Sequence, residues 1–163
     1  MSKAFTSEEA TLDVLVPPRA PLPPGVPNYV TPRGLERLRA ERLELQAARA
    51  ELERGPEEGR GAALAAWSTR LGELDQRLAS AELVVPGAGQ HAVVRFGSRV
   101  TVAGDGGEEK TFEIVGVDEA DAARGKIAFL APIARALLGR EVGDSVSVQT
   151  PGKLQELEIV ALE

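Results

Sequence analysis

The chain has 163 residues, 43% hydrophobic content and a formal net charge of -6, which suits one or two compact domains. It contains no cysteine and one histidine, His91, which excludes disulfides, thiolate zinc sites and histidine-rich metal centres. The negative charge and the 4% aromatic content argue against a free-standing nucleic-acid binder. No signal-peptide core and no apolar run of about 18 residues occurs, so we expect a soluble cytoplasmic protein.

Residues 1–30 end in a proline-rich stretch. Because proline removes a backbone donor and fixes φ, a continuous helix or a central strand is excluded there. We expect a disordered, extended tail, with a PxxP-type ligand segment as the alternative. The prolines responsible are Pro17, Pro18, Pro21, Pro23, Pro24 and Pro27.

Residues 31–85 predict an antiparallel helical hairpin. Thr31 can cap a helix whose first residue is Pro32, and arginines at 42 and 49 interrupt its leucine seam. A segment rich in glycine, residues 55–61, then favours a turn. The second helix has a single apolar stripe at helical spacing, which should face the first helix. That stripe consists of Leu64, Trp67, Leu71, Leu74, Leu78 and Ala81.

Residues 86–163 change to a period of two. Alternating patterns predict strands at 98–102 and 111–117, joined by a glycine-rich hairpin turn. A short helix is expected at 134–138, and two further strands at 145–150 and 154–162. The fold class is therefore α+β: a helical hairpin followed by an antiparallel sheet that packs on one short helix.

Several separated segments carry a resemblance to a known family. The stretch that begins at Phe112, FEIVGVDEADAARGKIAFLAPIARALLGREVGDSVSVQTPG, is the longest, and MSKAFT, NYVTPRGLERLRAE and RLASAELV accompany it. Together they resemble the GreA/GreB family of transcription elongation factors, and its GreB branch in particular. The resemblance implies a C-terminal domain with an FK506-binding-protein-like fold, and a regulator of transcription elongation that is not itself an enzyme.

The resemblance also implies a partner, bacterial RNA polymerase. The C-terminal domain would bind the outer rim of the polymerase secondary channel, while the hairpin reaches into the channel. No cofactor of its own, no membrane association and no sequence-specific nucleic-acid binding are implied, and we expect a monomer. One segment corresponds to the family's docking surface and has an alanine in place of the usual serine. The alternative interpretation of its apolar residues is that they belong to the core of the domain. The segment comprises Ala131, Pro132, Ile133, Ala134 and Arg135.

The tip of the hairpin differs from the family pattern. Members that stimulate transcript cleavage carry an acidic tip resembling Asp-x-x-Glu-Asn, whose carboxylates help to hold a magnesium ion in the polymerase active site. Here the candidates are Glu57 and Glu58, with Arg60 as a candidate channel contact. Each arm is also shorter by about one heptad, or about 10 Å of reach. Two interpretations stay open: a cleavage factor that acts with polymerase-bound magnesium, or a regulator that occupies the channel.

Two other classes of protein are possible interpretations of the sequence. A peptidyl-prolyl isomerase is suggested by the fold that the strand domain resembles, but such a site needs several aromatic rings, and only Phe96, Phe112 and Phe129 are available. A coiled-coil partner protein that is independent of polymerase would need apolar residues on the outside of the hairpin. The outward positions are polar instead: Glu36, Arg37, Glu44, Glu73 and Gln76.

Overall fold

The computed structural model describes residues 18–87 and 91–163. Over this part, the chain forms two compact units. The first, the hairpin unit, contains residues 18–28 and 35–81. The second, the C-terminal unit, contains Tyr29–Gly34 together with the chain from Glu82 onward. The first turn of the hairpin's leading helix therefore belongs to the C-terminal unit.

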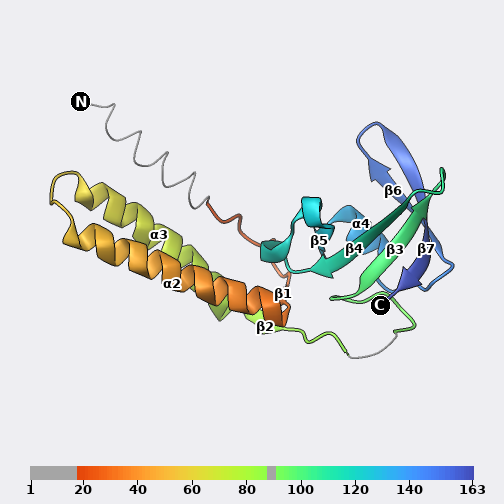
Figure 1. Cartoon of the computed structure of the whole chain (residues 1–163), viewed down its shortest axis with the longest axis horizontal. Helices are drawn as coiled ribbons and strands as arrows, with labels where there is room; N and C mark the ends of the chain where they lie inside the picture. The colour runs from red at the N-terminus through yellow and green to blue at the C-terminus, as the bar shows by residue number, and fades with distance from the viewer. Residues whose placement is uncertain (1–17, 88–90) are drawn as a thin grey trace. The chain divides into compact units, whose positions relative to one another are not determined.

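Two antiparallel helices form the hairpin, α2 (Pro32–Arg54) and α3 (Arg60–Ala79), as Figure 1 shows. The predicted cap is confirmed, because the Gly34 amide donates to the Thr31 hydroxyl oxygen at 3.0 Å. The predicted turn is also present, and Gly59 adopts a φ of 75° immediately before α3. Helix α3 starts at Arg60, slightly earlier than the glycine pattern indicates.

The hairpin seam has an apolar middle and a charged base. Nearer the tip, Trp67 is only half-buried. On the base side, Arg77 is 7% exposed, although it is charged. Both seam arginines form ion pairs with carboxylates. Arg42 pairs with Asp75 at 2.6 Å, and Arg49 pairs with Glu53 of the same helix. The buried apolar seam residues are Leu38, Leu45, Leu71 and Leu74.

The segment before α2 is structured from residue 18 onward. Strand β1 (Asn28–Val30) pairs with β2 (Ala81–Leu83), which includes the last residue of the predicted apolar stripe. Arg19 and Ala20 contact the hairpin helices through hydrogen bonds. The prediction of a disordered tail up to residue 30 is therefore wrong for residues 18–30, and its first 17 residues lie outside the described part.

The C-terminal unit contains a five-stranded sheet with the order β5-β4-β3-β7-β6. The predicted turn between β3 and β4 is present, with the Gly104 amide donating to the Glu108 carbonyl at 2.9 Å. All neighbouring strands are antiparallel except β4 and β5, which are parallel, so the prediction of a purely antiparallel sheet is wrong at that edge. The strands are β3 (Arg99–Gly104), β4 (Glu109–Val115), β5 (Lys126–Ala128), β6 (Ser145–Thr150) and β7 (Lys153–Leu162).

One face of this sheet is apolar and the other polar. The short helix α4 (Pro132–Leu137) contacts β6 and buries Ala134 and Leu137 completely. The opposite face carries the hydrogen bond between Thr101 and Thr111, 2.9 Å long. The buried strand residues include Val100, Val102, Ile114, Val146, Leu157 and Ile159. Burial of this apolar set fixes α4 on the domain and determines which of its residues remain on the surface.

A buried carboxylate anchors the segment Tyr29–Gly34 within the C-terminal unit. Glu119, in the 3₁₀ turn Val117–Glu119, is 4% exposed. Its carboxylate accepts hydrogen bonds from the Thr31 amide at 3.2 Å, the Thr31 hydroxyl and the Gly116 amide at 3.3 Å. Three donors satisfy the charge of a buried acid that would otherwise be costly to desolvate.

An aromatic cluster lies in the same unit as this anchor. The ring of Tyr29 lies 5.7 Å from Phe96 and 5.4 Å from Phe129, and the two phenylalanines are 5.7 Å apart. Such tilted and edge-on arrangements are favourable for aromatic pairs. Two of the three phenylalanines of this unit are therefore occupied in holding the chain segment before α2.

Candidate functional site

The predicted docking segment lies at the start of α4. Pro132 occupies the first helical position, where its missing amide costs nothing. Pro132 and Arg135 are exposed, whereas Ala131 and Ile133 are half-buried. Ala134 has no exposed surface, so it packs in the core and is not available to a partner. Leu137 also has no exposed surface and is a core residue.

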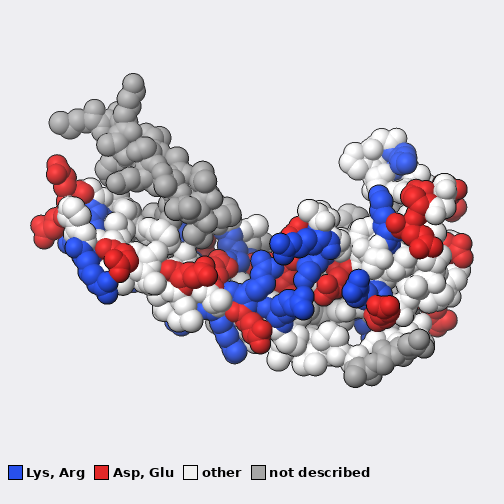
Figure 2. Space-filling view, in the orientation of Figure 1, with Lys and Arg blue, Asp and Glu red and all other residues white. Residues whose placement is uncertain are grey.

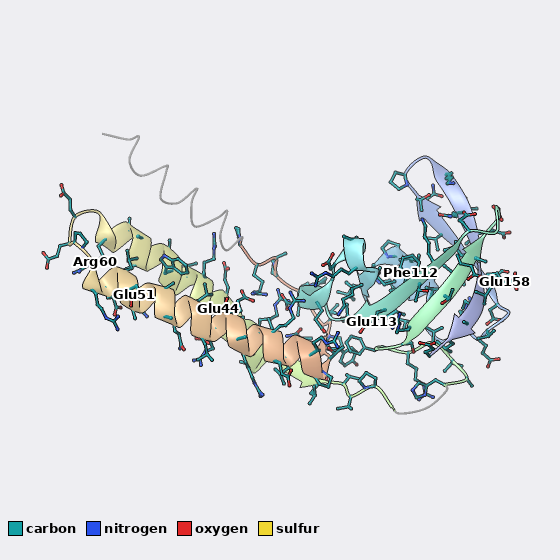
Figure 3. All side chains as sticks on the ribbon, viewed as in Figure 1. Glu44, Glu51, Arg60, Phe112, Glu113 and Glu158 are labelled. Atoms are coloured by element: carbon teal, nitrogen blue, oxygen red, sulfur yellow. The ribbon has the colours of Figure 1, made fainter. Side chains whose placement is uncertain are left out.

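A small cleft opens beside α4. It measures about 50 Å³, and its lining includes Ile133, Phe112 and Leu157. Figure 3 labels Phe112 on β4. The other residues that line the cleft are Val102, Gly104, Glu108, Lys110 and Gln155. Sequence reasoning missed the participation of Phe112, although the alternation along β4 places it on the same face as Ile114.

The geometry does not favour a prolyl-isomerase site. Pockets that enclose small molecules are typically about 300–1,000 Å³, against about 50 Å³ for this cleft. Phe112 is the only aromatic residue among those lining it. Phe96 and Phe129 instead pack on Tyr29. The cleft has room for part of one apolar side chain from a partner.

The tip acids stand in solvent. Glu57 has 92% of its side chain exposed, and Glu58 is exposed in the same turn. Farther back on α2, Glu51 pairs with Arg54. Across residues 18–87 and 91–163, no group of three acidic or histidine side chains is placed to hold a metal ion.

Arg60 lies at the tip end of the hairpin (Figure 3) but folds back on it. Its Nη1 atom donates to the carbonyl oxygens of Glu53 at 2.8 Å and Gly55 at 2.9 Å. These carbonyls lie at the carboxyl end of α2, where helices lack internal donors and favour cations. Arg60 thus caps α2, and its predicted role as a channel contact stays a prediction.

This geometry makes a testable prediction about the tip. Replacing Arg60 with alanine should lower the free energy of unfolding of the hairpin by about 1–2 kcal/mol, because two charge-assisted hydrogen bonds to carbonyls are lost. Urea denaturation followed by the fluorescence of Trp67, the only tryptophan, measures the change. Arg37→Ala, an exposed arginine on α2, serves as the control. Equal stabilities of the two variants would contradict the capping role.

Charges of both signs are interspersed on the hairpin face drawn in Figure 2. Several charged residues of the hairpin form ion pairs, such as Arg42 with Asp75 and Arg70 with Glu73. This pattern is typical of a solvated helix surface. No helix in the described part of the chain is long and apolar enough to cross a membrane.

Comparisons with known proteins find similarity to transcription elongation factors. Residues 89–163 match the family described as transcription elongation factor, GreA/GreB, C-term. The transcription elongation factor GreA of Sinorhizobium medicae is 43% identical over 95 residues, which are 58% of this chain and 60% of that protein. GreA of Hyphomonas neptunium is 44% identical over 92 residues, 56% of this chain and 59% of that protein. The match thus spans about 60% of these curated relatives.

Solved structures of similar proteins cover more of the chain at lower identity. A prokaryotic transcription elongation factor GreA/GreB from Nitrosomonas europaea is 27% identical over 84% of this chain and 98% of that one, with a TM-score of 0.42. GreA factor homolog 1 of Thermus thermophilus is 24% identical over 85% and 99%, with a TM-score of 0.39.

The chain is an α+β protein in which a helical hairpin precedes a curled mixed sheet and the short helix α4. Residues 89–163 of the chain are similar to the C-terminal domain of the GreA/GreB family of transcription elongation factors. The curated relatives named here are GreA proteins, so the assignment to the GreB branch stays a prediction.

Proposed function

We propose that this protein is a regulator of transcription elongation that binds bacterial RNA polymerase through the surface around α4. The GreA/GreB C-terminal domain model matches residues 89–163, the part of the chain that carries this surface. The docking place is the rim of the polymerase secondary channel, the hairpin enters that channel, and the protein acts as a cytoplasmic monomer without a cofactor of its own.

The observation that carries the proposal is the combination of α4 and its cleft. Exposed Pro132 and Arg135 flank Ile133, which lines the cleft together with Phe112 and Leu157. An apolar anchor surrounded by polar and charged groups is typical of a protein-docking surface. A partner would insert one aliphatic side chain into the cleft and place a carboxylate near Arg135.

Binding to purified core RNA polymerase tests the proposal directly. The Arg135→Glu variant should bind at least about tenfold more weakly, because the guanidinium would be replaced by a like charge facing the partner's carboxylate. Ile133→Ala should also weaken binding, through loss of the apolar anchor. Lys153→Glu, at an exposed position where β7 begins, makes the same charge change away from α4 and should bind normally. Absence of binding by the unmodified protein would refute the proposal.

The tip determines which kind of regulator this is. Glu57 and Glu58 form a two-carboxylate tip in solvent, and α2 spans 23 residues, about 35 Å. We infer a regulator that occupies the channel, with transcript cleavage as the alternative function. Backtracked elongation complexes distinguish the two: cleavage products that disappear with Glu57→Gln and Glu58→Gln would establish the alternative, and polymerase binding without products would support the first.

A further inference from the structure

The segment of residues 18–28, called here the N-terminal clamp, contacts both hairpin helices. The guanidinium of Arg19 pairs with Glu41 of α2 at 2.5 Å, and its side chain is only 17% exposed. The backbone amide of Arg19 donates to Glu73 of α3 at 3.3 Å. A single residue therefore bridges the two arms by polar contacts on the outside of the seam.

The clamp is fastened at its other end as well. Asn28 is 3% exposed, and its side-chain amide donates to the Arg77 carbonyl at 2.8 Å and to the Ser80 hydroxyl at 3.1 Å. Both acceptors lie in the last turn of α3 or just after it, where carbonyls lack partners within the helix. Between the two ends, a turn at Gly25 (φ 74°) redirects the chain.

A buried arginine explains why the hairpin base benefits from the clamp. Arg77 lies on α3 one position before Leu78 of the apolar stripe, and it is 7% exposed. A guanidinium at this depth must make hydrogen bonds in place of those it made with water. The clamp supplies one acceptor, the carbonyl oxygen of Ala20, which accepts from Arg77 Nη2.

The composition of the clamp lowers the entropic cost of ordering it. Pro18, Pro21, Pro23, Pro24 and Pro27 restrict the unfolded chain to extended conformations. A small number of polar contacts can therefore hold the segment along α3, where Pro21 and Leu22 line a groove together with Glu73 and Gln76.

From these contacts we propose that residues 18–28 are an intramolecular clamp that holds the base of the hairpin closed. The clamp ties α2 to α3 through Arg19 and solvates the buried Arg77 through Ala20. This property is independent of polymerase binding and goes beyond the proposed function. It predicts that the base of the hairpin, unlike its tip, depends on a segment outside the two helices.

Hydrogen exchange of the full-length protein, read by mass spectrometry, tests the clamp. Arg19→Gln should raise the exchange rate of α3 amides between Glu73 and Ser80 by about tenfold, because opening of the base becomes easier. Amides near Trp67, toward the tip, should keep their rates. Arg39→Gln, which changes an exposed arginine of α2, is the matched control and should leave both regions unchanged.

A double-mutant cycle locates the effect in the clamp. If Arg19 acts through Glu41, then Arg19→Gln should add little to the exchange rate of a Glu41→Gln protein. Additive effects of the two changes would overturn the bridge between the arms. Unchanged exchange at the base in Arg19→Gln would overturn the clamp as a whole, whatever the affinity of the protein for polymerase.

Discussion

Replacing Gly34 with alanine should destabilise the C-terminal unit by about 3 kcal/mol, even though alanine is the better helix former. A Cβ atom at position 34 would lie 2.2 Å from the Glu119 carboxyl carbon. The buried carboxylate would have to move away from its donors, the amides of Thr31 and Gly116, and would lose charge-assisted hydrogen bonds. Urea denaturation followed by near-ultraviolet circular dichroism of Tyr29, the only tyrosine, measures the loss.

Two further variants separate this clash from a general effect of alanine. Gly72 on α3 has open space around its Cβ position, so Gly72→Ala should be neutral or stabilise the hairpin by up to about 1 kcal/mol. In a Glu119→Ala background, which removes the carboxylate, Gly34→Ala should cost little more. If Gly34→Ala alone were as stable as the unmodified protein, Glu119 would not be the reason for glycine at position 34.

The second large effect is expected in the hairpin. Leu74 has no exposed surface, so Leu74→Ala should lower the free energy of unfolding by about 3–4 kcal/mol through lost burial and the cavity left behind. The change should appear as a lower urea midpoint of the Trp67 fluorescence transition.

Leu43 provides the matched control for this prediction. It lies on the other helix with 66% of its surface exposed, so Leu43→Ala should change the stability by no more than about 0.5 kcal/mol. A cost at Leu43 that equals the cost at Leu74 would mean that the seam is not where the structure places it.

Local patterns predicted most of the elements because they report on local physics. Thr31 followed by Pro32 predicted the start of α2, and the spacing of Leu71 and Leu74 predicted the buried side of α3. Strand β6 begins and ends at the predicted residues, Ser145 and Thr150. In each case the signal lies within a few neighbouring residues, as capping and amphipathic periodicity require.

Features that depend on distant partners were missed. Nothing near Glu119 in the sequence indicates that its carboxylate binds Thr31, which is 88 residues away. Arg77 is buried beneath the clamp, although arginine is mostly a surface residue. Strand β5 has only three residues and lies parallel to β4, so it has too little alternation to be recognised. Tertiary contacts override local preferences at these positions.

In the candidate site too, the sequence predicted local features and missed those that depend on the tertiary structure. The α4 segment was found from the resemblance, but the sequence could not separate exposed Arg135 from buried Ala134, because a helix of one and a half turns has no clear periodicity. The role of Arg60 as a cap depends on the path of the turn from Gly55 to Gly59, which glycine leaves free to vary. Glu57 and Glu58 were placed correctly in the turn, and their catalytic role stays a prediction.

The hydrogen bond between Thr31 and Glu119 also has a consequence for synthesis of the chain. A ribosome adds about 5–20 residues per second, so the 88 residues that separate these partners take roughly 4–18 s to make. Until the end of that interval the segment Tyr29–Gly34 lacks Glu119 and Phe129, whereas both hairpin helices are complete once Ala79 has been added. The helical hairpin is therefore synthesised before the first turn of α2 can form its hydrogen bonds with Glu119. The rate of translation determines the length of this delay.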